Sequence, residues 1–323
     1  MKRVTGFLIL TLALAFAACQ SAGTNQPNNG AASPNQAVKA APSAEPGVSE
    51  AKPPIFSINS APDTGEPVKF PFPDFPRVAV AAKAGDYVLA PSYNWIKDAA
   101  EKGVETTSFI WYVQKMAAPG KEDSELQFLQ ERHKVPNAYI IPIPQKQTAK
   151  KGDIILTWWQ TGSGMQRAIV VDDSDPSRPI VRYLDIAYNN PAKSRDGSTT
   201  IGRMDERLIP DSFVRLKSWD PGTRVAIKVG ANQKAGTVIR GAGTGVLVLE
   251  AGNKLTVYPK SNCESVPLRP NVSVGDRVKA PRYGQSFAGA TVSSVDMRNG
   301  RVFVRFDGGK EDEAIAFGDV LKD

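Results

Sequence analysis

One four-residue frame recurs along the chain and constrains its fold more than any other feature. A glycine, an Asp or Thr, any residue and then Val or Ile occur at 85–88, 152–155, 222–225 and 275–278. Each copy follows a polar or proline-containing stretch and precedes a run of apolar or alternating residues. Because Gly and Asp favour turns and such runs favour strands, each copy predicts a turn that leads into a β-strand.

A second pattern marks the end of each unit. A β-branched residue followed by a small residue or proline occurs in four segments, 134–141, 208–216, 265–270 and 314–321. Proline cannot donate a hydrogen bond to a neighbouring strand, so it ends strand pairing and starts a turn. Start and end patterns in the same order predict four repeats. They span residues 76–144, 145–217, 218–273 and 274–323.

The last repeat shows the expected architecture most clearly. Its apolar residues alternate with polar ones, and Asn299-Gly300 is a dipeptide that favours a type I′ hairpin turn. Four or five short strands fill residues 274–323 and leave no room for crossover helices, so the pairing must be antiparallel. Small sheets protect their edges by curling closed. We therefore expect an all-β fold of tandem small antiparallel barrels, with a longer, helix-compatible connection at 94–103 in the first repeat.

The last repeat resembles a Tudor or agenet-like barrel of the SH3 type. The resemblance rests on the Gly275-Asp276-x-Val278-x-Ala280 start, the Ala-Thr-Val of the second strand, "VRFDGG" and the closing "GDVL". It is less complete in the second and third repeats. It is weakest in the first, which lacks the Val-Arg-aromatic element that the second repeat keeps at 181–183. The resemblance implies small ligand-binding modules rather than catalytic ones.

The resemblance also implies aromatic cages, which in the Tudor family grip a methylated cationic side chain through cation–π attraction. In the fourth repeat the matching positions are Tyr283, Phe287 and Phe306, with Asp307 as the acidic wall. In the second repeat they are Trp158, Trp159 and Tyr183, with Asp185 as the acidic wall. The third repeat has no aromatic residue at these positions.

Packing in the core is the alternative role for several of these rings. Phe306 alternates with Val302 and Val304, which favours a place in the core. Trp158 and Trp159 are neighbours on one predicted strand, so both cannot point inward. In the first repeat only Tyr93 and Trp111 match the cage positions.

The N-terminus has the pattern of an export signal over residues 1–18. Lys2 and Arg3 precede an apolar run that is too short for a comfortable membrane span. The following "FAAC" resembles the lipobox of bacterial lipoproteins, with Phe16 in place of the usual leucine. In that family the cysteine, here Cys19, is acylated and becomes the mature N-terminus. We expect an exported lipoprotein of the outer rather than the inner bacterial membrane. An ordinary signal with an incidental cysteine is the alternative.

Residues 19–75 are expected to form the lipidated cysteine and a disordered tether. Ala, Ser, Asn and Pro dominate this segment, and it has no apolar periodicity. Such a composition cannot bury enough apolar surface to offset the entropy lost on ordering. The pieces at 56–58 and 70–75 are the ones with enough apolar surface to dock on the first repeat.

Patterns for catalysis and metal binding are weak. His133 is the only histidine, and Cys263 has no cysteine partner after Cys19 is acylated, which excludes disulfide frameworks and thiolate or His metal clusters. Residues 160–166 lack the lysine of a phosphate loop, and 170–176 carry three carboxylates without the Gly and Glu of a calcium loop. Turns are expected at both places. We expect no catalytic residue, cofactor or metal, and therefore no enzyme.

Two classes of binding function remain open. The first is peptide or protein binding through the Tudor-like repeats. The second follows from the net charge of +7, because the basic excess lies in residues 145–273. This excess favours an anionic envelope polymer or glycan, with contacts from Arg167, Arg178, Lys228, Lys234 and Arg240. A general solubilising role for the charge is the alternative, and nucleic acid is not an expected partner of an exported lipoprotein.

Overall fold

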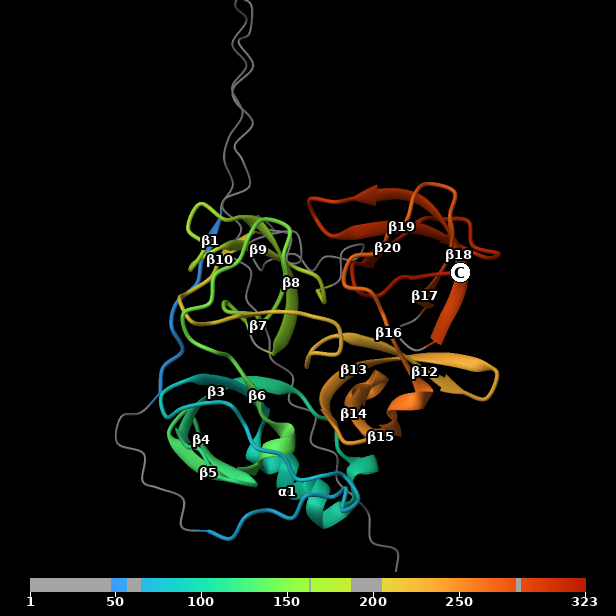
Figure 1. Ribbon diagram of the computed structural model, residues 1–323. Coiled ribbons are helices and arrows are strands. Elements are labelled where there is room, and N and C mark those ends of the chain that lie inside the picture. Colours follow the sequence, from blue (N-terminus) through green and yellow to red (C-terminus); the bar gives the residue numbers. More distant parts are fainter. Residues whose placement is uncertain (1–47, 57–64, 163, 187–204, 283–285) are drawn as a thin grey trace, which may run out of the picture. The chain divides into compact units, whose positions relative to one another are not determined.

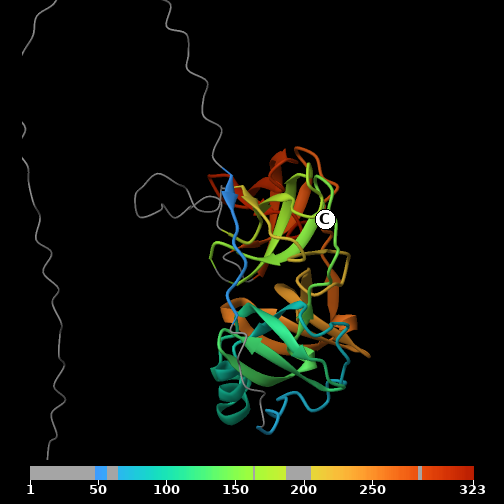
Figure 2. The same ribbon diagram turned by 90° about the vertical axis from the view of Figure 1, so that its left-hand side faces the viewer.

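The structure is a computed structural model, and it describes residues 48–56, 65–162, 164–186, 205–282 and 286–323 (Figure 1). The described residues form three sheets, antiparallel except for one short parallel pairing, together with one α-helix, α1 (Tyr93–Lys102) (Figure 2). The helix lies where the helix-compatible connection was expected, and it buries Ile96 and Ala99. In the part of the chain that is described, no helix has the length and apolar character needed to cross a membrane.

The range predicted for the first repeat contains a sheet of five strands. They are β2 (Tyr87–Pro91), β3 (Trp111–Ala118), β4 (Asp123–Phe128), β5 (Glu131–Pro136) and β6 (Ile141–Pro142). The first four pair in succession, and β6 returns to pair with β2. A 3-10 turn, η2 (Asn137–Tyr139), precedes β6, and a second one, η1 (Val104–Thr106), follows α1.

The same order of pairing occurs in each of the other predicted ranges. The second contains β7 (Ile154–Trp158), β8 (Met165–Asp172), β9 (Ile180–Tyr183), β10 (Glu206–Arg207) and β11 (Val214–Arg215). The third contains β12 (Arg224–Val229), β13 (Asn232–Ala242), β14 (Gly245–Glu250), β15 (Lys254–Pro259) and β16 (Cys263–Ser265), with 3-10 turns η3 (Ala251–Asn253) and η4 (Lys260–Asn262). The fourth contains β17 (Arg277–Arg282), β18 (Ser286–Asp296), β19 (Arg301–Phe306), β20 (Glu313–Ala316) and β21 (Leu321–Lys322).

In every range the last strand pairs antiparallel with the first. The third and fourth sets share one sheet, because β13 pairs with β18 at Lys234 and Ser286. These pairings confirm the all-β, antiparallel fold class. Closure of each set into a barrel stays a prediction.

The recurring glycine frame forms the same turn in all four sets. Gly85, Gly152, Gly222 and Gly275 have φ angles of 92°, 83°, 91° and 90°, respectively. L side chains rarely adopt this conformation, which explains why glycine stands there. Each glycine amide donates to a carbonyl of the second strand of its set. The acceptors are Met116, Val170, Val238 and Val292, each at the point where a β-bulge shifts the strand register.

The acidic residue of the frame closes this turn. In three sets the Asp carboxylate accepts a hydrogen bond from the backbone amide three residues earlier, as Asp276 does from Ser273 at 2.9 Å. In the third set Thr223 takes the Asp position and donates its hydroxyl to the carbonyl of Asp220. The Asp220 carboxylate then accepts from the amide of Lys217 at 2.7 Å. In both forms of the frame the side chain therefore bonds to the backbone of the residue three positions earlier, as an acceptor in Asp and as a donor in Thr.

Part of the predicted tether has defined contacts, so the ordered chain begins before residue 76. A short strand, β1 (Ser49–Glu50), pairs in parallel with β10. Phe70 lies edge-on against Tyr139 with 5.0 Å between ring centroids, and Phe75 is buried. Alternating Phe and Pro supply apolar rings without any helix or strand periodicity, which is why composition alone predicted disorder here. Residues 19–47 and 57–64 of the predicted tether lie outside the described part.

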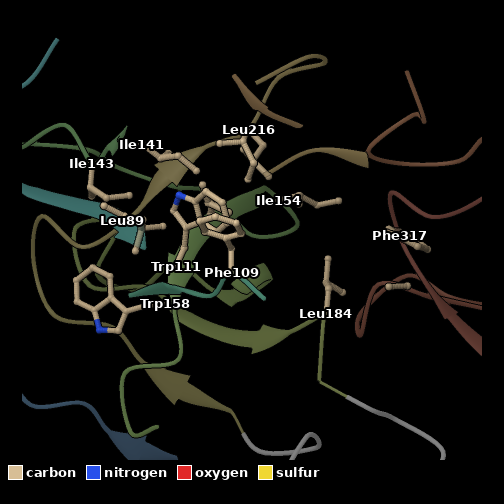
Figure 3. Packing of buried hydrophobic residues seen from close by; sticks show 14 of the residues in the cluster. Leu89, Phe109, Trp111, Ile141, Ile143, Ile154, Trp158, Leu184, Leu216 and Phe317 are labelled. Atoms are coloured by element: carbon tan, nitrogen blue, oxygen red, sulfur yellow. The ribbon is translucent and has the colours of Figure 1, made fainter. Parts of the chain in front are cut away.

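A hydrophobic cluster brings together buried residues from the four sets (Figure 3). Trp111 and Phe109 lie in its centre, and the Trp111 indole nitrogen donates to the carbonyl of Tyr139 at 2.8 Å. Leu184 and Phe317 extend the cluster into the second and fourth sets. Trp111 is therefore a core residue, and the match of this position to a cage wall is wrong.

Candidate functional site

The described members of the predicted fourth-set cage do not share a site. Phe306 is 2% exposed and packs with Val302 and Val304. It therefore has the core position that was the alternative to a ligand contact. Phe287 is half-buried and packs in a different cluster, with Ala226, Val266 and Leu321. Tyr283 lies outside the described residues.

Charged side chains of this set already have partners within the chain. Asp307 accepts hydrogen bonds from both terminal nitrogens of Arg277, at 2.7 and 2.8 Å. These hydrogen bonds lower the pKa of Asp307. The Arg282 guanidinium lies 5.1 Å from the Phe306 ring centroid, so a cation of the chain itself takes the position that a ligand cation would occupy.

The aromatic residues of the predicted second-set cage lie in two different hydrophobic clusters, Trp158 in one and Trp159 with Tyr183 in the other. Trp158 is 3% exposed, and its ring centroid lies 5.3 Å from that of Tyr87 in the first set. Trp159 packs in a separate cluster, and its indole nitrogen donates to the Thr161 hydroxyl at 2.9 Å. Tyr183 is 4% exposed, donates to the carbonyl of Trp158, and has its pKa raised by burial. Both Trp158 and Tyr183 are thus core residues.

The acidic residue of that cage, Asp185, belongs to a group of four charged side chains that we call the ionic cluster. Its other members are Arg167, Arg224 and Asp319. Arg167 contacts Asp185 at 2.6 Å and Asp319 at 2.9 Å, and Arg224 contacts the same two carboxylates at 3.2 and 3.0 Å. The cluster therefore joins the second, third and fourth sets.

The ionic cluster is buried at Arg167 and partly exposed at its other three side chains. The Arg167 side chain is only 1% exposed, and it also donates to the carbonyl of Phe317 at 3.2 Å. Burial alone would raise the pKa of Asp185, but Arg167 and Arg224 outweigh it and hold that pKa well below its usual range. Removing one member of a buried pair leaves an uncompensated charge, so this arrangement has a structural role.

Two of the five residues of the predicted basic patch are held by contacts within the chain. Arg167 belongs to the ionic cluster, and Arg240 is half-buried and donates to the carbonyl of Ile140. Arg178 lies 3.5 Å from Glu50. Lys228 and Lys234 are exposed. The described structure therefore gives no continuous surface made of all five residues.

An open aromatic surface lies instead on the first set, where the sequence resemblance to a Tudor-like module is weakest. Tyr93 stacks on His133 with 4.0 Å between ring centroids and 6° between planes. Tyr112 stacks on Trp95 at 5.6 Å and on Phe128 at 5.8 Å. All five rings are half-buried, so each keeps one part toward solvent.

A cavity of about 640 Å³ is lined by three of these rings, those of Tyr93, Phe128 and His133, and we call it the aromatic groove. Its lining comes from residue 55, the start of α1 and the β4–β5 hairpin: Ile55, Ser92, Tyr93, Asn94, Phe128, Leu129, Gln130, Glu131 and His133. Ile55 is 87% exposed and Leu129 is 59% exposed. Glu131 lies 3.0 Å from Nε2 of His133. The groove thus combines exposed aliphatic side chains, aromatic rings, neutral hydrogen-bonding groups and the carboxylate of Glu131.

Most of this surface was not predicted, except for Tyr93. The useful signal was strand alternation: once Trp111 points inward, its neighbour Tyr112 must point outward. Phe128 is brought beside Tyr112 by the antiparallel pairing of β3 and β4, and Trp95 by the helix after β2. These placements depend on pairing between strands rather than on any local motif.

The other motifs form turns. The carboxylates of Asp172 and Asp175 accept hydrogen bonds from Ser174 and Ser177, two residues later in each case. Residues 160–162 and 164 lie between β7 and β8, whereas Met165 and Gln166 begin β8. Cys263 is half-buried, and burial raises the pKa of its thiol. Over the described ranges, no group of three or more His, Cys, Asp or Glu is placed to hold a metal ion.

Comparison with known proteins gives little further information. No protein-family model matches the chain, and no curated protein matches it. Among solved structures, the crystal structure of ADCP1 tandem Agenet domain 3-4 is similar over 32% of this chain and 80% of that chain, with 17% sequence identity and a TM-score of 0.20. A TM-score of this size does not establish a shared fold. The description of the four sets therefore rests on their own strand pairings.

Proposed function

We propose that the chain is a non-catalytic binding protein whose aromatic groove accepts an extended polypeptide carrying apolar side chains. The observation that carries this proposal is the exposure of Ile55 and Leu129 beside the rings of Tyr93 and Phe128. Burying apolar surface stabilises a complex by about 25 cal/mol per Å². Exposed apolar side chains gathered around a cavity therefore favour a ligand that covers them.

The polar lining supports a polypeptide rather than an anionic polymer. Ser92, Asn94 and Gln130 supply hydroxyl and amide groups that can pair with a peptide backbone. Glu131 lines the groove, and neither Lys nor Arg is among its described lining residues. A polyanion would find no compensating positive charge there.

The order of the strands supports the Tudor or SH3-type barrel as the binding module. Each set has four successive strands and a fifth that returns to the first, and in the first and third sets a 3-10 turn precedes the fifth strand. In this proposal the four modules form a scaffold, and the first provides the aromatic groove.

We further propose that the protein is held at the outer membrane of a bacterial envelope through acylated Cys19. The charged start, the apolar run and the "FAAC" sequence support this proposal. Replacing Cys19→Ser is expected to move the protein from the membrane fraction to the soluble envelope fraction. Retention of the variant in the membrane fraction would contradict the proposed anchor.

Selection of peptides tests the groove. Short random peptides displayed on phage are selected against the mature chain, and enriched sequences are synthesised and titrated by calorimetry. We expect them to carry apolar or aromatic residues and to lose at least about tenfold in affinity for Leu129→Asp, because that residue lies on the groove.

A matched control is Met297→Asp, because Met297 is also 59% exposed but lies on the β18–β19 connection of the fourth set. This variant should bind the selected peptides as the parent chain does. Equal losses in both variants, or no enrichment of any peptide, would contradict the proposal.

A further inference from the structure

The third set carries a cavity of about 320 Å³ that we call the cationic cavity. It lies between the segment before β12 and the β13–β14 turn, and its lining includes Trp219, Arg240, Lys260 and glycines 241, 243 and 245. Its described lining contains two cationic side chains and no acidic one. Cavities of this size are within the range of ligand sites.

Neither positive charge is neutralised by an ion pair within the described residues. Arg240 donates to the carbonyls of Ile140 and Asn137, which are neutral acceptors. Lys260 is exposed, and its ammonium lies 4.8 Å from the centre of the Trp219 ring. The cavity therefore keeps a positive potential that an anionic group of a ligand would compensate.

The equivalent surface of the first set shows what kind of ligand such a place can hold. There the residues before β4 and the 3-10 turn before the last strand are covered by an extended proline-rich segment of the chain itself, residues 67–78. Phe70 of this segment packs on Tyr139, and Arg77 forms an ion pair with Glu122. The chain thus contains one example of an extended segment bound at this position of the module.

The charges at the two equivalent surfaces are opposite. The first set presents Glu122 and Asp123, and the covering segment carries Lys69 and Arg77. The third set presents only cationic residues, and the described segment before β12 supplies no carboxylate to the lining.

We propose that the cationic cavity binds an extended acidic polypeptide segment. Electrostatic complementarity selects the acidic partner, and the covered surface of the first set indicates its extended form. Gly241 has open space where a side chain would stand, whereas Pro76 and Phe75 of the chain already lie close to Gly243 and Gly245, so a peptide backbone would approach the wall at Gly241. This surface shares no lining residue with the aromatic groove, so the two proposals succeed or fail separately.

Two matched peptides test this proposal on the mature chain. One has the sequence of residues 67–78, PVKFPFPDFPRV. The other is identical except for Glu at the Lys69 and Arg77 positions. We expect the acidic peptide to bind at least about tenfold more tightly than the basic one, and its affinity to fall as salt is raised. Equal affinity of the two peptides would overturn the proposal.

Two charge-reversal variants then test whether the acidic peptide binds at the cationic cavity. Lys260→Glu is expected to reduce the affinity for the acidic peptide at least about tenfold. Lys228→Glu makes the same change of charge at an exposed position of β12 outside the cavity, and it should retain most of the affinity. Equal losses in both variants would show a non-specific charge effect and overturn the assignment. Tighter, Lys260-dependent binding of dextran sulfate than of the acidic peptide would assign an anionic polymer instead and would also overturn it.

Discussion

The first and fourth sets pair their strands in the same order but use their aromatic residues in opposite ways. In the fourth set Phe306 is in the core, with Arg282 over its ring. In the first set Tyr93, Tyr112 and Phe128 are half-buried, and Tyr93 and Phe128 line a cavity. Among the residues that the structure describes, the set with the clearest sequence resemblance is thus not the one whose aromatic rings line an open cavity. A motif that specifies a fold well can say little about where a ligand binds.

The contrast between the buried ring of Phe306 and the half-buried ring of Phe128 predicts the largest effect on the free energy of unfolding. Phe306→Ala should reduce the free energy of unfolding by about 3–5 kcal/mol, because it removes a buried ring and leaves a cavity. Phe128→Ala removes a half-exposed ring and should reduce it by less than about 2 kcal/mol. Denaturant unfolding monitored by circular dichroism measures both, and a larger cost for Phe128→Ala would reverse the assignment of the two rings.

The two predicted acidic cage walls, Asp185 and Asp307, differ in the burial of their arginine partners. Arg167→Ala should reduce the free energy of unfolding by about 3–5 kcal/mol, because it leaves Asp185 and Asp319 facing a junction without their main partner. Arg277→Ala removes the exposed partner of Asp307 and should cost at most about 1 kcal/mol. Equal costs would show that the ionic cluster is no more important than a surface ion pair.

The ionic cluster also predicts a dependence on pH. The pKa of Asp185 is lower in the folded chain than in the unfolded one, because Arg167 and Arg224 outweigh the effect of burial. Its contribution to stability is therefore present above the ordinary Asp pKa and is lost as the pH falls through the lower folded value. Unfolding of Asp185→Asn should show a shallower loss of stability than the parent chain as the pH falls below about 4. An unchanged slope would contradict the depressed pKa.

Replacing a glycine of the recurring turn frame is expected to have the smallest effect on the free energy of unfolding. An added Cβ at Gly275 meets no other atom within 4 Å, so Gly275→Ala tests backbone conformation alone. With φ at 90°, the substitution should cost about 1–2 kcal/mol in the free energy of unfolding. Gly241→Ala also meets no atom within 4 Å and has no positive φ, so it should cost less. Equal costs at the two glycines would show that the positive φ is not the reason for glycine in the frame.

The sequence predicted those features that depend on local chemistry. Gly275 and Asp276 specify a turn through one backbone angle and one hydrogen bond three residues away, so their pattern could be recognised without a structure. The role of Asp185 could not, because its partner Arg167 also contacts Asp319, 152 residues from Arg167. The aromatic groove could not either, because it requires the pairing of β3 with β4 and the position of α1.

Hydrogen–deuterium exchange with and without a selected peptide tests the central claim most directly. The account predicts that peptide binding slows exchange at residues 92–94 and 128–133, which line the aromatic groove. Residues 283–287 and 306–307 of the fourth set should exchange as they do in the free chain. Protection of the fourth-set residues without protection at the groove would contradict the account.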